Sequence, residues 1–141
     1  MDIPKLIDEF NNTDVKDMTL DFLVDLGDAL KFAKWEYRTL LQVAQRHIDL
    51  LSQFPDKQIM QQLDLNFVNA FSNYEHDLSE VSFEPIINGL DKTDNLAFIS
   101  MTIHFLSATG DRKYASIVRS YLDYSNPAIQ DIAKDCMKYL K

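Results

Sequence analysis

The sequence has few of the residues that cross-link or sharply turn a chain: its 141 residues include one cysteine, three glycines and four prolines. The single Cys136 excludes an internal disulfide. So few glycines and prolines disfavour a sheet protein built on tight turns, and the composition favours helices. A chain of this length buries about 68–70% of the surface that its unfolded form exposes, so we expect one domain, residues 1–141, without a covalent cross-link.

Motifs for several kinds of chemistry are also absent. No Glu is followed three residues later by His, and the sequence contains no H-E-x-x-H, no C-x-x-C and no Gly-rich phosphate loop. We therefore predict a protein that is not an enzyme, and we assign no catalytic residue, cofactor or metal. The formal charge of −8 argues against a nucleic-acid partner, because phosphate binding needs clustered Lys and Arg.

The sequence has no pattern typical of secretion or membrane insertion. Met1 is followed by Asp2, Pro4 and Asp8 rather than by a basic and then apolar leader. The uncharged segment 95–110 has sixteen residues, fewer than the roughly 20 that a membrane span needs. We expect a cytoplasmic protein that does not bind membranes. The oligomeric state cannot be predicted from the sequence.

Apolar residues recur with helical spacing along the whole chain, which predicts an all-α fold of about seven to eight helices. Asp17 is the expected cap of the second helix, Phe54-Pro55 ends the third, and Asn126 caps the last, with Pro127 at its first position. Gly27 suggests a close contact between helices. The expected helices cover residues 3–11, 18–33, 36–54, 56–73, a short segment from 82 with Pro85 in its first turn, 95–110, a segment from 111, and 126 to the end.

The segment 95–110, NLAFISMTIHFLSATG, is the one around which we expect the fold to be organised. It has no charge, and apolar side chains lie all round it when it is drawn as a helix. This pattern is typical of a helix buried on both sides. Thr93 or Asp94 is the expected cap, and Gly110 suits the left-handed position that follows a helix.

The second half of the chain contains a weak internal repeat, with shifts of 31 and 34 residues between matching apolar positions. Two helical hairpins in tandem produce such a pattern, and hairpins of this kind stack to bury their apolar faces. The segment 82–141 resembles HEAT-like repeats, on the evidence of Gly110-Asp111, Ala115, Leu122, Asn126-Pro127, Ile129 and Ala133. Gln130 departs from the Arg that the family often has after the position of Ile129.

The resemblance implies a right-handed stack of antiparallel helical hairpins, a HEAT-like α-solenoid, and most HEAT-like proteins are binding scaffolds. Some bacterial immunity proteins, which neutralise a toxin, are similar small, acidic, helical proteins.

The histidines and the cysteine have both structural and functional interpretations. His47 and His104 lie within apolar stripes, which favours hydrogen-bonded structural histidines, although either could line a ligand cavity. His76 with Glu80 is better explained as part of a solvated acidic turn than as a metal site. Cys136 lies on a core stripe, which favours a buried, inert thiol over a nucleophile.

The acidic residues are concentrated in two stretches. Residues 1–30 have a net charge of −6, and residues 58–91 contain no Lys or Arg at all. Acidic side chains interleaved with aromatic ones suit a basic protein, although a solvated face that keeps the protein soluble is an equal alternative. We predict that the partner-binding residues of the second stretch are Asp64, Phe71, Tyr74, Glu75, Asp77, Glu80 and Glu84. The competing acidic stretch contains Asp8, Glu9, Asp14, Asp17, Asp21, Asp25 and Asp28.

These observations favour a non-enzymatic binding protein, with an immunity protein that occludes a basic toxin, such as a nuclease, as the leading hypothesis. A general helical-repeat adaptor that uses apolar grooves between hairpins is an alternative. Its binding would change little with salt, whereas charge-steered association slows as ionic strength rises. A small-molecule-binding or enzymatic helical domain, with His47 or His104 and nearby tyrosines in a pocket, is a third possibility.

Overall fold

The protein is all-helical in the computed structural model, which describes residues 2–71 and 78–140. This part of the chain contains helices and no strand. The α-helices are α1 (Ile3–Asn12), α2 (Leu20–Phe32), α3 (Tyr37–Leu51), α4 (Lys57–Phe71), α5 (Glu84–Leu90), α6 (Leu96–Ala108), α7 (Ala115–Arg119) and α8 (Pro127–Met137), and the short 3₁₀ helices are η1 (Val15–Asp17) and η2 (Arg112–Tyr114).

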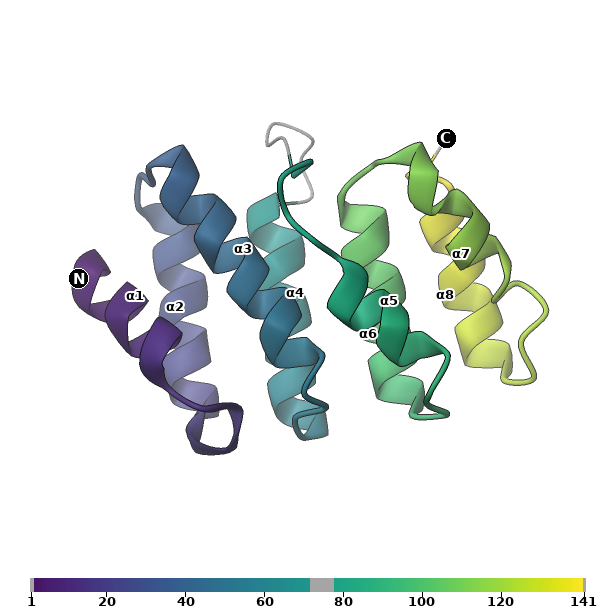
Figure 1. Ribbon diagram of the computed structural model, residues 1–141, viewed down its shortest axis with the longest axis horizontal. Coiled ribbons are helices and arrows are strands. Elements are labelled where there is room, and N and C mark those ends of the chain that lie inside the picture. Colours follow the sequence, from purple (N-terminus) through teal and green to yellow (C-terminus); the bar gives the residue numbers. More distant parts are fainter. Residues whose placement is uncertain (1, 72–77, 141) are drawn as a thin grey trace.

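The helices form two rows (Figure 1). One row contains α1, α3, α5 and α7, and the other contains α2, α4, α6 and α8. Consecutive α-helices therefore lie in opposite rows. The second row has the most extensive helix contacts, which join α2 to α4, α4 to α6 and α6 to α8. The two ends of the chain lie at opposite ends of the rows.

Helix α6 is buried on both sides, as its uncharged sequence predicts. Nine of its 13 residues are buried. The ring of Phe105 stacks on that of Phe67 of α4 with 4.1 Å between their centroids. On the other side α6 contacts α8. One continuous cluster of buried residues extends from Phe10 to Leu140 and passes through this helix.

The helix ends follow the sequence expectations in part. Gly110 has a φ of 64°, the left-handed conformation that was predicted for it after α6. The Asn126 side chain accepts hydrogen bonds from the backbone N–H groups of Ala128 and Ile129, and Pro127 is the first residue of α8. These two predictions are confirmed.

Two predicted caps are wrong by one or two positions. Thr19 rather than Asp17 caps α2, because Asp17 belongs to η1, and the Thr19 hydroxyl accepts from the Phe22 N–H. Asn95 rather than Thr93 or Asp94 caps α6. The Thr93 hydroxyl instead accepts from the Asn95 N–H at 3.0 Å. At the start of α6, the side chains of Thr93 and Asn95 therefore each accept a hydrogen bond from a backbone N–H group.

Gly27 marks a close contact between α2 and α4, as expected. A Cβ atom at this position would lie 2.3 Å from Oδ1 of Asn66. The Asn66 side chain is buried, and its Nδ2 donates to the Leu23 carbonyl at 2.8 Å. A buried amide with its hydrogen bonds satisfied thus occupies the space that a larger residue at Gly27 would need.

Leu106→Ala tests the central position of α6. Leu106 is fully buried, so we expect a loss of about 2–5 kcal/mol in the free energy of unfolding, measured by urea denaturation. Leu96→Ala, the same change at a 43% exposed position of the same helix, is the control and should cost much less. Equal losses in the two variants would contradict the central role of α6.

Candidate functional site

The structure describes four of the seven residues that the sequence groups into one partner-binding surface, Asp64, Phe71, Glu80 and Glu84. Tyr74, Glu75 and Asp77 lie outside the described residues. Phe71 is only 1% exposed, and its ring lies 5.0 Å from that of Phe67 in the core. Phe71 therefore belongs to the apolar stripe of α4, and its assignment to a partner-binding surface is corrected.

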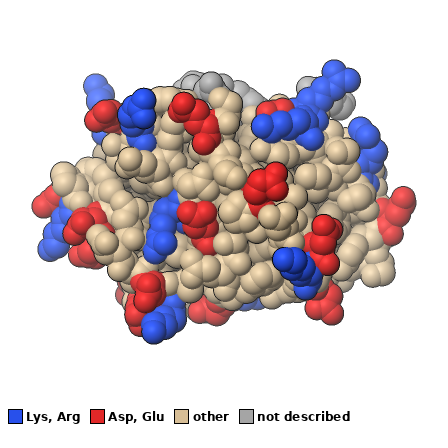
Figure 2. Space-filling model, viewed as in Figure 1, with Lys and Arg blue, Asp and Glu red and all other residues tan. Residues whose placement is uncertain are grey.

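The described acidic members of the predicted set are Asp64, Glu80 and Glu84, and they are not all in one row of helices. Asp64 is on α4, whereas Glu84 opens α5 in the other row. Glu80 is exposed and lines a small depression that also contains Arg38 of α3. Figure 2 views the face formed by the row of α1, α3, α5 and α7, where basic and acidic side chains lie side by side. That face is not a continuous acidic surface.

The acidic residues of the first stretch remain on the surface. All seven are exposed, and helix α2 carries three of them at helical spacing, Asp21, Asp25 and Asp28. None of these three forms an ion pair with another described residue.

A groove runs across the row formed by α2, α4, α6 and α8. It consists of three hollows. The central hollow, of about 400 Å³, lies between α4, α6 and α8. A larger hollow of about 700 Å³ shares His104 with it, and a hollow of about 270 Å³ between α2 and α4 shares Leu65 with it. Each neighbouring hollow thus shares one lining residue with the central one, and we refer to the three hollows together as the groove.

Large apolar side chains line this groove without being covered. Val24 is 41% exposed, Leu65 53%, Leu96 43% and Tyr139 57%. The outward strip of α6, which consists of Ser100, His104 and Ser107 at helical spacing, also lines it. The groove is therefore largely apolar, with polar groups at its centre.

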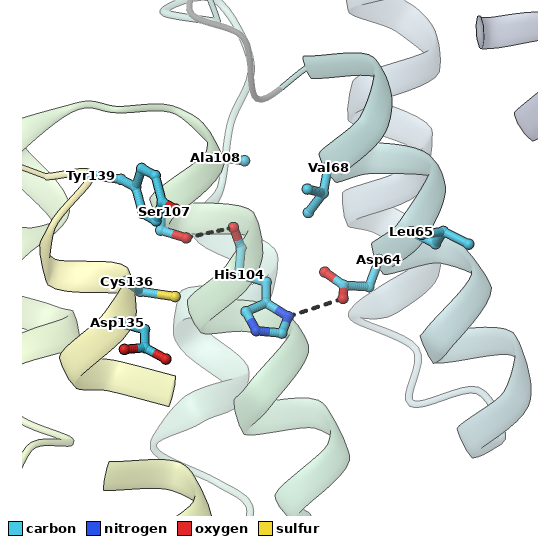
Figure 3. Close-up of a pocket in the computed structure, with 9 residues that line it drawn as sticks. All are labelled: Asp64, Leu65, Val68, His104, Ser107, Ala108, Asp135, Cys136 and Tyr139. Carbon is cyan, nitrogen blue, oxygen red and sulfur yellow. Dashed lines mark hydrogen bonds and ion pairs between the residues drawn. The ribbon is translucent and has the colours of Figure 1, made fainter. Parts of the chain in front are cut away.

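An ion pair between His104 and Asp64 lies at the centre of the groove. His104 Nδ1 donates to Asp64 Oδ2 at 2.9 Å and so links α6 to α4 (Figure 3). The hydrogen bond that His104 donates to Asp64 raises the pKa of His104 above its ordinary value, against the opposing effect of burial. Asp64 Oδ1 is buried and has no hydrogen-bond partner among the described residues.

The thiol of Cys136 lines the central hollow with His104, Asp64 and Ser107. These residue types occur together in nucleophilic catalysis. Burial, however, raises the pKa of Cys136; a side-chain hydrogen bond with Ser107 acts in the opposite direction, and the carboxylates of Asp135 and Asp64 raise the pKa further. A neutral thiol is a poor nucleophile.

His47, unlike His104, is a buried residue of the core. It is fully buried, its Nδ1 donates to the Val43 carbonyl at 2.8 Å, and its ring lies 5.0 Å from that of Phe10. Burial lowers the pKa of His47 to about 4. His104, and not His47, lines the groove.

Sequence reasoning did not find the pair of Asp64 and His104. The two residues are 40 positions apart, so no short motif connects them. The available signal was the position of His104 at helical spacing from Ser100 and Ser107, on a polar strip of a mainly apolar helix.

The fold and the groove thus define a class, an all-helical protein with an open groove along one row of helices. Comparison with protein-family models, with curated proteins and with solved structures gives no match. Among the described residues, no helix is long and apolar enough to cross a membrane, and no three His, Cys, Asp or Glu side chains are placed to hold a metal ion together.

Asp64→Asn tests the link between α4 and α6. A raised pKa of His104 stabilises the folded state below pH 6.5, and this contribution disappears as pH rises through the folded-state pKa. We therefore expect Asp64→Asn to cost about 1 kcal/mol at pH 6 and less at pH 9, measured by urea denaturation. Asp131→Asn, at an exposed position of α8, is the control and should show no such pH dependence. A loss that is the same at both pH values would contradict the link.

His47→Leu tests the buried histidine. Because the pKa of His47 is about 4 in the folded protein and about 6.5 in the unfolded chain, its contribution is complete above pH 6.5 and is lost as pH falls towards 4. The loss amounts to roughly 3 kcal/mol. His47→Leu should flatten the fall in the free energy of unfolding over this range, and parallel curves for variant and wild type would show that His47 is not its source.

Proposed function

We propose that this chain is a non-enzymatic protein-binding module that holds a basic partner along the groove of α2, α4, α6 and α8. The observation that carries the proposal is the set of exposed apolar side chains in that groove, Val24, Leu65, Leu96 and Tyr139. Exposed apolar side chains that line hollows among polar residues are typical of an interaction site.

The charge of the chain supports a basic partner. The net charge is −8, and Asp21, Asp25 and Asp28 are exposed on α2. Asp28 also lines the hollow between α2 and α4, together with Lys31, so one of these carboxylates reaches the end of the groove. Carboxylates in such a position accelerate association with a cationic protein, while the apolar contacts slow its dissociation.

In its particular form, the proposal is that the chain is a cytoplasmic immunity protein, which occludes a basic toxin such as a nuclease. We further propose that the two rows of helices are the layers of a HEAT-like α-solenoid. The alternation of rows along the chain and the tandem hairpin pattern of the sequence support this assignment.

A general adaptor is the second candidate, and the mainly apolar lining of the groove favours it. The two candidates differ in how their binding depends on salt. Charge-steered association weakens strongly between low and high ionic strength, whereas apolar binding changes little.

A display library of random twelve-residue peptides, selected on the purified protein, tests the proposal. We expect the selected peptides to combine Lys or Arg with large apolar residues, and to associate more slowly at high salt. Leu65→Asp should weaken their binding at least about tenfold, because it places a charge in the apolar part of the groove.

Leu20→Asp is the matched control for this experiment. It adds the same charge at a 38% exposed leucine of α2 that does not line the three hollows, and binding should persist. Selection of acidic peptides, or equal effects of the two variants, would contradict the proposal. Salt-independent binding of apolar peptides would favour the adaptor instead.

A further inference from the structure

The central hollow has apolar walls and acidic groups on two sides. Val68 of α4, Ala108 of α6 and Tyr139, just beyond α8, contribute apolar surface, and Leu65 of α4 also lines the hollow, although its side chain points away from Asp64 (Figure 3). Asp64 lies on the side of α4, and Asp135 lies across from it on the side of α8. A volume of about 400 Å³ is ample for one large side chain.

The charge of the central hollow is negative. No Lys or Arg is among the described residues that line it. The carboxylates of Asp64 and Asp135 both act on the Cys136 thiol between them, whose pKa they help to raise. Lys138 pairs with Asp135 at 3.6 Å, but both side chains are largely exposed, at 67% and 73%. Such an exposed pair is weak, so another cation can replace Lys138 with little loss.

An arginine side chain has the chemistry that this hollow accommodates. Its aliphatic stem covers apolar surface, here that of Val68. Its planar guanidinium has donors pointing in several directions, which suits carboxylates on two sides. The ring of Tyr139 offers a further favourable surface for a cation.

We propose that the central hollow is an arginine-binding site, in which a guanidinium group of the partner lies between Asp64 and Asp135. The proposal rests on the proposed function, since it names the side chain by which a basic partner is held. Lysine, with a compact ammonium group, fits the two separated carboxylates less well.

Occupation of the site competes with protonation of His104. The imidazolium form of His104 neutralises Asp64, whereas the neutral form leaves the carboxylate charge uncompensated. The other ionisable groups around His104 are Asp135, Cys136 and Tyr139 in the central hollow and Asp56 and Lys57 in the adjoining one. Arginine should therefore bind more tightly as pH rises through the pKa of His104, and bound arginine should lower that pKa.

The test is a titration of the full chain with Nα-acetyl-arginine N-methylamide, followed by NMR of backbone amides and of the His104 imidazole. We expect saturable shifts in the residues that line the central hollow. We also expect binding at least about fivefold tighter than that of the uncharged norleucine analogue, and a lower pKa of His104 in the presence of the probe. The lysine analogue should bind between the two.

Asp135→Asn, at an exposed position that leaves folding intact, should weaken the binding of the arginine probe several-fold. Asp131→Asn, the same change on the same helix outside the hollow, should not. Equal binding of the arginine and norleucine probes, or equal effects of the two variants, would overturn the site. If that occurs while the peptide library still yields basic and apolar ligands sensitive to Leu65→Asp, the arginine site is wrong and the proposed function stands.

Discussion

The burial of α6 between α4 and α8 is the constraint on which the rest of the structure depends. A helix with apolar side chains on most of its circumference must be covered on several sides, and α4, α5 and α8 supply that cover. One narrow strip of α6 is not fully covered by these helices and lines the hollows of the groove. It consists of Ser100, His104 and Ser107. The element that organises the core therefore also lines the groove.

Periodicity was sufficient to predict the helices, because each buries one continuous stripe and the period of that stripe is visible in the sequence. Positions that require one residue type were also predictable, such as Gly110 with its positive φ and Asn126 before Pro127. The starts of α2 and α6 were less predictable. Several adjacent residues there have side chains that can cap, and local hydrogen bonds decide which one does.

The candidate site was harder to predict for a physical reason. Asp64 and Phe71 are two helical turns apart and so lie on nearly the same side of α4, yet Phe71 is in the core whereas Asp64 lines the central hollow. The helical period alone therefore does not tell the buried residue from the one that lines the hollow. The pairing of Asp64 with His104 depends on the contact of α4 with α6, which no local pattern encodes. Sequence reasoning identified the residue types of the site but not their neighbours.

The acidic residues of α1 and α2 and the apolar side chains of the groove contribute differently to binding, although Asp28, Asp64 and Asp135 also line the hollows. The uncompensated carboxylates are most numerous on the exposed surface of α1 and α2, where they act at long range, whereas the apolar side chains lie in the groove, where they act only in contact. Association and retention of a partner therefore depend on different residues. Substitutions on α2 should act mainly on the rate of association, and substitutions around Leu65 and His104 mainly on the rate of dissociation.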